Sequence, residues 1–555
     1  MDDAANAGRA TRLADAYWER LLELEPLIAT SVGDERFDDR LGDPGPDGRD
    51  ALAEASRALL DGLDEIDVPA LPGSLRGTLD VAEAMARRAL AEVEHREDRL
   101  RVASHFAGPA QILADVASLQ RADTPERLDR YVARLGAVPA YLDAWSTIAR
   151  EGVATGVTSP RVVAERSVAQ VERLLAIAPE DSPALLPAGE DVAARERRAA
   201  IVRDVVNPAF EGFLGVLRET LPAATETLGV TALPGGDALY ATAILGWTSL
   251  PLDPAEVHRI GVEAYDGIQD ERREVAARLG FAGADEALAA HEASGANHAA
   301  TREEMLELAR SQVERSWETA KGWFGRMPAA NCEVKPVEEF READTPGGFY
   351  FPPTEDGTRP GAYYINTSDL GERPLHHVAS LTYHEANPGH HFQISLDQEA
   401  TDRPPLRRFG GILAGSAYAE GWGLYSERLA DEMGLYLDDW ERLGMLESQG
   451  LRAARLVTDT GLHALGWSRE RAIDTLVAIG MPEVDATIEV DRYISLPGQA
   501  LAYMIGMREI VAARRAAEAS DGAAFVLSDF HDRVLALGSL PLPAFRREMG
   551  LAPDR

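Results

Sequence analysis

Helical periodicity dominates the first half of the chain and restricts what it can fold into. From residue 51 to about residue 221, apolar residues recur every three or four positions among Ala, Arg and Glu, and residues 10–25 show the same pattern. Prolines interrupt the run and should divide it into separate helices. No repeat of fixed length is present, so the pattern predicts a packed helical bundle rather than a solenoid.

The pattern changes after the helical pair expected over residues 255–324. Short runs of β-branched and aromatic residues at 333–335, 348–351 and 362–366 are separated by Pro- and Gly-rich turns, which predicts a small sheet. The predicted fold class is therefore mainly α with one small β-sheet. An edge strand of that sheet can hold an extended substrate by backbone hydrogen bonds; the alternative is a purely structural ribbon.

The length of 555 residues exceeds a usual single core. We predict an N-terminal helical lobe over residues 1–250 and a catalytic lobe over residues 251–555. The 56 Lys and Arg against 92 Asp and Glu give a formal net charge of −36, which repels phosphate backbones and anionic membrane surfaces. Neither nucleic acid nor a membrane is expected as a partner.

Three features predict a soluble, cytoplasmic protein. The N-terminus lacks the basic and apolar regions of a secretory signal, and no uninterrupted apolar stretch is long enough to span a bilayer. The one cysteine, Cys332, cannot form an internal disulfide and is expected to be structural. The oligomeric state is left open.

The strongest chemical motif is H-E-A-N-P-G-H-H, which begins at His384 and Glu385 and ends at His390 and His391. In the ordinary motif H-E-x-x-H, both histidines bind zinc from one helix face and the glutamate activates water. On a uniform helix His390 would lie roughly 240° round from His384, too far to share an ion. The Pro-Gly pair should bulge or break the helix and can bring His390 back. The alternative is a kinked helix with a histidine-rich surface.

A catalytic zinc site needs a third protein ligand and one open position. Glu420 is the predicted third ligand, in a segment made largely of small and aromatic residues. Glu427, seven residues later and close to the same helix face, is expected to orient a histidine from behind. His391 is a further supporting group, or the second ligand in place of His390. A buried salt bridge is the competing explanation for either glutamate.

Residues 492–506 place polar side chains in an apolar context. Tyr503 is the candidate for stabilising an oxyanion; the alternative is a core tyrosine. Arg492 or Arg359 is suited to bind a terminal carboxylate; the alternative is an arginine in a salt bridge. Gln499 and Tyr364 are also expected to contact substrate. His376 and His377 precede the motif and are expected to be capping or supporting groups rather than ligands.

Several motifs together resemble a known family. They are G-D-E-R-F-D-D-R-L at residues 33–41, D-G-T-R-P-G at 356–361, the histidine motif, E-G-W at 420–422 and P-G-Q at 497–499. Over nearly its full length the chain resembles the bacterial family called domain of unknown function 885. That family is similar to thermolysin-like helical zinc peptidases, including the thimet oligopeptidase and carboxypeptidase Taq groups. The resemblance implies a large two-lobed helical architecture with a deep cleft.

The resemblance also implies roles for individual residues. The H-E-x-G-H motif of those groups matches His384, Glu385, Gly389 and His390 if Asn387 and Pro388 are the insertion, which favours His390 over His391. Their third ligand and a glutamate seven residues later match Glu420 and Glu427. The G-Y-x-x-x-Y-x-x-G run of carboxypeptidase Taq matches Gly498, Tyr503 and Gly506, with Gln499 in place of the first tyrosine.

The expected function is that of a metallopeptidase in which Zn²⁺ is held by His384, His390 and Glu420 and Glu385 is the general base. Short peptides are the expected substrates, cleaved in carboxypeptidase or oligopeptidase fashion. One alternative is a zinc hydrolase of a non-peptide amide or ester. Another is a helical binding protein with structural zinc or no metal, in which His391 completes a closed set of four ligands.

Overall fold

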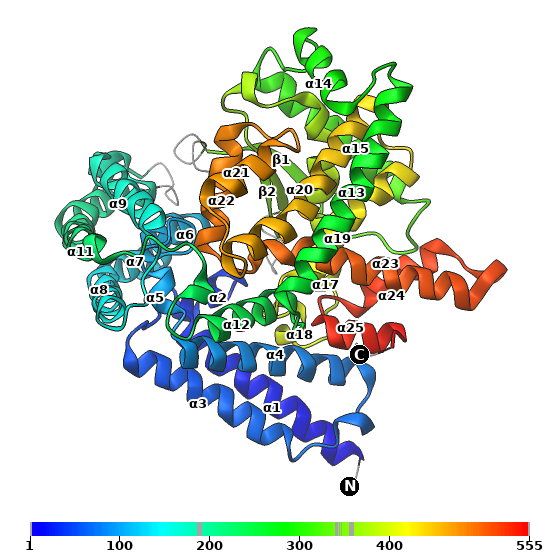
Figure 1. Ribbon diagram of the computed structural model, residues 1–555. Helices are drawn as coiled ribbons and strands as arrows, with labels where there is room; N and C mark the ends of the chain where they lie inside the picture. Colours follow the sequence, from blue (N-terminus) through cyan, green and yellow to red (C-terminus); the bar gives the residue numbers. More distant parts are fainter. Residues whose placement is uncertain are drawn as a thin grey trace. The chain divides into compact units, whose positions relative to one another are not determined.

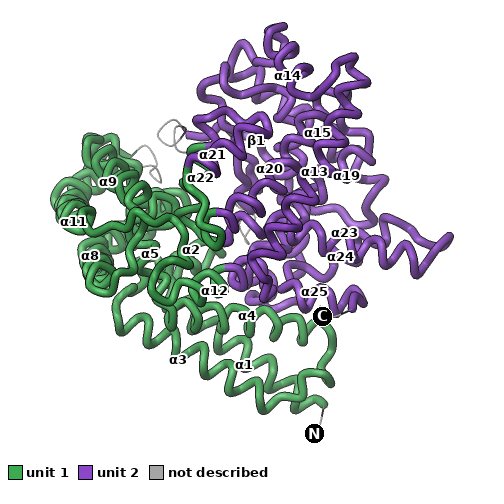
Figure 2. Tube along the Cα trace, in the orientation of Figure 1, with its two compact units in different colours: residues 1–243, 462–469, 487–497 green, residues 244–461, 470–486, 498–555 purple. Residues whose placement is uncertain are grey.

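The computed structural model divides the chain into two compact units (Figure 2). It describes residues 3–185, 191–338, 342, 345, 347–353 and 360–552. Unit 1 comprises residues 1–243, 462–469 and 487–497, and unit 2 comprises residues 244–461, 470–486 and 498–555. Two short segments from the C-terminal half therefore belong with the N-terminal residues. Most of the described chain is helical with one small sheet, which confirms the predicted mainly α fold (Figure 1).

Unit 1 is built from helices whose starts coincide with prolines in several cases, because a proline at the first helical turn loses no hydrogen bond. Its helices are α1 (Asp3–Leu24), α2 (Pro26–Ser31), α3 (Pro46–Leu63), α4 (Gly73–His95), α5 (Asp98–Arg101), α6 (Ile112–Leu119), α7 (Pro125–Gly136), α8 (Val138–Thr155), α9 (Arg161–Ala176), α10 (Val192–Ile201) and α11 (Asn207–Thr220). Helix α12 (Gly236–Thr248) begins in this unit and ends in unit 2.

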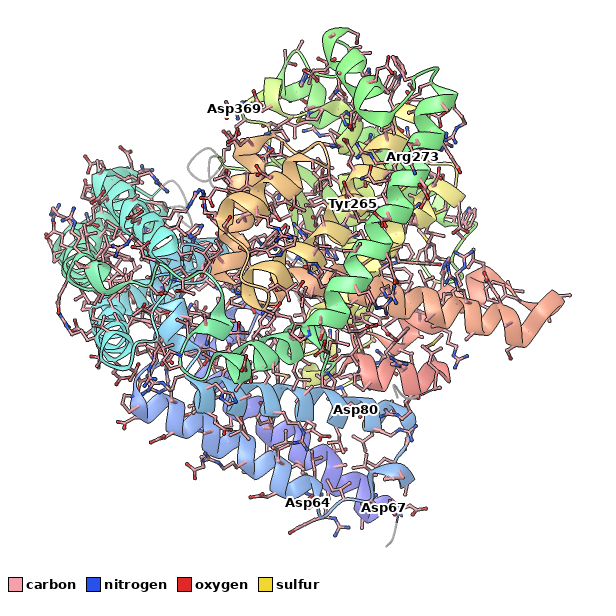
Figure 3. All side chains as sticks on the ribbon, viewed as in Figure 1. Asp64, Asp67, Asp80, Tyr265, Arg273 and Asp369 are labelled. Carbon is pink, nitrogen blue, oxygen red and sulfur yellow. The ribbon has the colours of Figure 1, made fainter. Side chains whose placement is uncertain are left out.

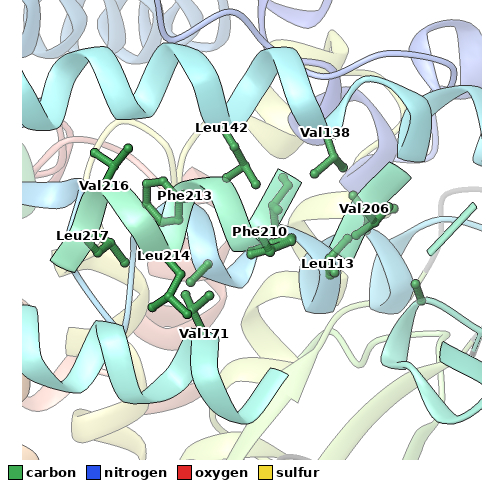
Figure 4. Close-up of a cluster of buried hydrophobic side chains, with 14 of the residues drawn as sticks. Leu113, Val138, Leu142, Val171, Val206, Phe210, Phe213, Leu214, Val216 and Leu217 are labelled. Carbon is green, nitrogen blue, oxygen red and sulfur yellow. The ribbon is translucent and has the colours of Figure 1, made fainter. Parts of the chain in front are cut away.

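Buried aliphatic and aromatic side chains from several of these helices form the core of unit 1 (Figure 4). Leu142 of α8, Val171 of α9 and Phe210 and Phe213 of α11 are almost fully buried in this cluster. Their helical spacing places them on the inward faces, as the periodicity predicts. Asp64 and Asp67 beyond the end of α3 are exposed instead, and Asp369 is exposed in unit 2 (Figure 3).

Unit 2 carries all of the residues of the histidine motif. Its helices are α13 (Pro254–Arg278), α14 (Ala284–Ala293), α15 (Arg302–Ala320), α16 (Val378–Glu385), α17 (His390–Gln398), α18 (Pro405–Phe409), α19 (Ala417–Glu432), α23 (Ala502–Asp521), α24 (Leu527–Leu537) and α25 (Leu542–Met549). Helices α20 (Asp439–His463), α21 (Arg469–Val477) and α22 (Glu483–Ser495) have residues in both units. None of the described helices combines the length and the apolar character needed to cross a bilayer.

The sheet of unit 2 has the strand order β1-β3-β2, formed by β1 (Cys332–Pro336), β3 (Gly361–Ile365) and β2 (Gly348–Phe351). Strand β3 is parallel to β1 and antiparallel to β2. Tyr363 is fully buried on one face, in a cluster with Met305 of α15 and Val378 of α16. Tyr350 lies opposite Tyr363 and contacts His391 of α17. This face of the sheet therefore supports the two helices of the histidine motif.

Candidate metal centre

Three side chains from three helices converge in unit 2. His384 lies at the end of α16, His390 is the first residue of α17, and Glu420 lies in the first turn of α19. The Oε2 atom of Glu420 is 3.7 Å from Nε2 of His384 and 3.4 Å from Nε2 of His390. Atoms bound to one tetrahedral zinc ion at about 2.0–2.1 Å are roughly 3.3 Å apart, so this set has the size of a zinc site.

A break in the backbone brings the two histidines together. Helix α16 ends at Glu385, Ala386 has φ −102° and ψ −105°, and the Asn387–Pro388 peptide is cis. A Cβ at Gly389 would overlap the carbonyl oxygen of His384. The chain can therefore turn back only with glycine at this position. The ring centroids of His384 and His390 are 4.7 Å apart as a result.

The turn is fixed from α19. Trp422 Nε1 donates a hydrogen bond of 2.8 Å to the carbonyl oxygen of Pro388, and the hydroxyl of Ser426 donates one of 3.2 Å to the same atom. A Cβ at Gly423 would lie 2.8 Å from Cε1 of His384 and 3.1 Å from Cε1 of His390. The E-G-W-G segment thus provides the ligand Glu420, the anchor for the turn and the space for both imidazoles.

Glu427 fixes the orientation of His384. Its Oε1 atom lies 2.8 Å from Nδ1 of His384, and its Oε2 atom accepts a hydrogen bond of 3.1 Å from Nε2 of Gln449 in α20. Because an ionised carboxylate only accepts, Nδ1 of His384 carries a hydrogen, and in the neutral ring Nε2 presents its lone pair towards Glu420. Metal-binding histidines are commonly oriented in this way.

The electrostatics of the cluster favour a bound cation. Burial lowers the pKa of His384, but the neighbouring Glu420, Glu427 and Glu385 outweigh this and raise the pKa to about 9. Burial acts to raise the pKa of Glu420, yet the two imidazoles hold it well below its ordinary value. Carboxylates around two imidazoles thus favour positive charge at this place, which a protonated imidazole or a divalent ion supplies. The residues present fit Zn²⁺.

The ligand set is reachable from solvent on one side. The side chain of His384 is only 2% exposed, whereas that of His390 is 13% exposed and that of Glu420 is 18% exposed. Glu385 follows His384 directly, and burial raises the pKa of its carboxyl group, although the imidazoles of His390 and His384 oppose this. A carboxylate with a raised pKa beside a partly open ligand set is suited to proton transfer.

Tyr503 lies beside this centre. Its ring is 6.4 Å from the ring of His384, and Nε2 of Gln499 is 3.5 Å from its hydroxyl oxygen. The guanidinium groups of Arg455 and Arg452 lie 4.6 Å and 5.7 Å from the centre of the Tyr503 ring. Both arginines belong to α20, which the sequence analysis did not single out. The three-residue spacing of Gln449, Arg452 and Arg455 on one helix face was the signal available for finding them.

Close packing of α19 and α23 holds Tyr503 in place (Figure 1). A Cβ at Gly506 would overlap the carbonyl oxygen of Ala417, and a Cβ at Gly421 would overlap the backbone of Gly506. The two helices therefore approach to backbone contact. The E-G-W and Y-x-x-G motifs contribute glycines to the same crossing.

Other residues singled out from the sequence lie elsewhere. His391 points away from Glu420, because its Nδ1 lies 2.9 Å from the hydroxyl of Tyr350 and its Nε2 lies 3.0 Å from the carbonyl oxygen of Ala330. Burial lowers its pKa to about 4. Burial likewise raises the pKa of the Cys332 thiol to about 12, which disfavours a nucleophilic thiolate.

One predicted substrate contact is not brought to the ligands. Tyr364 follows Tyr363 in β3 and therefore faces the opposite side of the sheet from the motif helices, where its ring stacks on Phe349 at 4.9 Å. Arg492 belongs to unit 1, where its guanidinium pairs with Glu489 at 3.4 Å. Arg359 lies outside the described residues.

The fold and the site define a mainly helical protein in which one buried histidine, one partly exposed histidine and a glutamate have zinc-ligand geometry. The chain belongs to the family described as bacterial protein of unknown function (DUF885), whose model matches residues 26–549. This confirms the family resemblance seen in the sequence. No curated protein matches the chain.

Two solved structures share the fold. One, titled as a "putative lipoprotein" from Colwellia psychrerythraea, is 27% identical, with a TM-score of 0.90 over 98% of this chain and 98% of that chain. The other, titled as a "putative lipoprotein of unknown function" from Shewanella oneidensis, is 19% identical, with a TM-score of 0.75 over 97% of this chain and 99% of that chain. The second likeness concerns the fold alone.

Replacing Gly389 by alanine tests whether the tight backbone turn at this residue brings His384 and His390 together. The added Cβ collides with the carbonyl oxygen of His384, so the two imidazoles should separate. We expect Gly389→Ala to weaken zinc binding at this centre by roughly 100-fold or more and to lower the melting temperature. Gly371→Ala is the matched control, because a Cβ there meets no atom within 4 Å. Unchanged zinc affinity in Gly389→Ala would contradict the geometry.

Replacing Glu420 by glutamine tests the third ligand. A neutral amide is a poor zinc ligand, so Glu420→Gln is expected to bind one zinc ion fewer per chain than the original protein. Metal content after equilibrium dialysis measures the difference. Glu432→Gln at the end of the same helix is the control and should bind zinc normally. The assignment fails if both variants retain the same metal content.

Proposed function

We propose that this chain is a zinc-dependent metallopeptidase that hydrolyses short peptides. One observation carries the proposal: His384, His390 and Glu420 place three ligand atoms within 4.8 Å of one another, beside the carboxylate of Glu385. Two histidines and one carboxylate form a common catalytic zinc set, which leaves a coordination position open. Zinc bound there supplies a Lewis acid that acidifies water and polarises a carbonyl group.

Glu385 is assigned the proton transfers. It takes a proton from the attacking water and then delivers it to the leaving amine nitrogen. Burial raises the pKa of this carboxyl group, which brings it closer to the range in which a group both accepts and releases protons near neutral pH. Glu427 and Gln449 keep the imidazole of His384 oriented throughout.

Tyr503 is assigned the stabilisation of the carbonyl oxygen of the substrate's peptide bond. Its hydroxyl group donates a hydrogen bond to that oxygen as negative charge develops on it. The guanidinium of Arg455, 4.6 Å from the ring centre, adds positive potential on the same side. Gln499, whose amide lies 3.5 Å from the hydroxyl, helps to orient the phenol group or contacts the substrate directly.

The proposed class of peptidase is supported by matches between motifs of this chain and those of known peptidase groups. The matches of the histidine motif, the Glu420 and Glu427 pair and the Tyr503 segment support a relationship to thermolysin-like helical zinc peptidases of the thimet oligopeptidase and carboxypeptidase Taq groups. Short peptides are the proposed partners, with no nucleic acid or membrane. A cytoplasmic location is part of the proposal, although the names of both structural neighbours describe those proteins as lipoproteins.

Replacing Glu385 by glutamine tests the mechanism. The zinc-loaded chain is expected to cleave a mixture of short peptides, and a chelator should abolish this activity. Glu385→Gln should retain its zinc while kcat falls by roughly 10²–10⁴-fold, because the general base is lost and the ligands remain. The exposed Glu372→Gln serves as control.

Mass spectrometry of the digest and metal analysis of each variant provide the readouts. Full activity of Glu385→Gln would remove its role as base. If the zinc-loaded chain cleaves esters or non-peptide amides but no peptide, the protein is a zinc hydrolase of another class and not a peptidase.

A further inference from the structure

A second cluster of potential ligands lies outside the proposed catalytic site. His376 and His377 belong to the short helix η11 (Leu375–His377), and Glu447 lies in α20. The Nε2 atoms of the two histidines are 2.8 Å and 2.7 Å from the same Oε2 atom of Glu447. All three ligand atoms lie within 4.8 Å of one another. Neighbouring imidazoles thus converge on one carboxylate oxygen.

The hydrogen bonds of His376 determine which nitrogen carries its hydrogen. Nδ1 is 2.8 Å from Oδ1 of Asn297, and the amide nitrogen of Asn297 donates a hydrogen bond of 3.3 Å to Glu292. The backbone N–H of His376 also donates to Oδ1, at 3.4 Å. The oxygen of Asn297 therefore faces His376, and Nδ1 is the donor. The lone pair of Nε2 is consequently directed at Glu447.

Two lone pairs at 2.8 Å repel each other, so either a proton on Nε2 or a metal cation lies between them. His377 directs its Nε2 to the same oxygen, so a single ion there contacts two imidazoles and one carboxylate, a frequent zinc ligand set. The other oxygen of Glu447 lies 3.3 Å from the guanidinium of Arg272. Arg272 therefore fixes the carboxylate and leaves Oε2 for the ion.

The backbone is adapted to this contact. A Cβ at Gly444 would overlap the carbonyl oxygen of His376, so only glycine lets α20 approach η11 this closely. Gly444 and Glu447 are three residues apart on one helix face, which carries Glu447 to the histidines. The side chain of His377 is 45% exposed and gives an ion access from solvent. His376 also lines a cavity of about 580 Å³ with His291 and Trp440.

We propose that His376, His377 and Glu447 form a second binding site for a divalent transition-metal ion of the zinc class. Around such an ion the Nε2 and Oε2 atoms are roughly 3.3 Å apart, so each pair widens by roughly 0.5 Å. The exposed side chain of His377 can make that adjustment for its own pair, whereas a shift of the Glu447 carboxylate makes it for the buried His376. This site stands independently of the peptidase proposal, because it shares no ligand with the catalytic set.

The second ion positions residues of the catalytic site and takes no part in the hydrolysis itself. Helix α16 follows η11 directly and ends at Glu385, immediately after His384, while α20 carries both Glu447 and Gln449. Gln449 holds Glu427, which orients His384. An ion at the second site therefore ties together the two segments that set the orientation of one catalytic ligand.

Zinc titration of the full-length, metal-stripped protein tests this site. With a colorimetric chelator as competitor, the original protein is expected to bind two zinc ions per chain and His377→Ala one, with the affinity of the second ion reduced roughly 100-fold or more. Glu420→Gln should also bind one, and the double variant none. His95→Ala in unit 1 is the matched control and should bind two.

Further variants separate the possible outcomes. His377→Gln keeps a polar group at this exposed position and should lose the same ion, and Asn297→Ala should weaken it roughly 10–100-fold without removing a ligand. If the original protein binds one zinc ion and His377→Ala binds it with the same affinity, the proposal is overturned and the cluster is an ion pair only. If the original protein binds one zinc ion, and this ion is lost in His377→Ala but kept in Glu420→Gln, the result supports the second site and refutes the catalytic site.

Discussion

The carbonyl oxygen of His384 occupies the space that a side chain at residue 389 would need, and the metal centre depends on this contact. A helix continued through the motif would place His390 roughly 240° round from His384. The tight backbone turn at Gly389 instead brings the two imidazole rings together, with their centroids 4.7 Å apart. The bonds from Trp422 and Ser426 to Pro388 then hold the turn against α19.

Once the turn is fixed, a chain of hydrogen bonds determines what the site can bind. Glu427 accepts from Nδ1 of His384, Gln449 donates to Glu427, and the opposite nitrogen of His384 is left for a cation. The two donors come from α16 and α20 and the acceptor carboxylate from α19, so the orientation of one imidazole is set by three helices. Rigid helices position ligands more closely than loops do, which is what metal selectivity requires.

The sequence predicted the mainly helical fold, the three strands and the break at Pro388 and Gly389, because these follow from local periodicity and backbone chemistry. It also proposed His384, His390 and Glu420 as a group, and the structure brings them together. It could not place Arg455 or Glu447, because their relevance depends on how α20 packs against segments distant in sequence. It could not place Tyr364 on the face of β3 opposite the motif helices, because which face of an alternating strand meets a helix depends on tertiary packing.

The two clusters differ in how firmly the backbone fixes their ligands. In the catalytic set Nε2 and Oε2 are 3.4–3.7 Å apart, wider than a hydrogen bond, because Gly389 and Gly423 fix the imidazoles on either side. In the second cluster the corresponding distances are 2.7–2.8 Å, which is direct hydrogen-bond contact. An ion entering the first set finds its ligands already spaced, whereas an ion entering the second must separate them. Preorganisation therefore makes the catalytic set the tighter of the two.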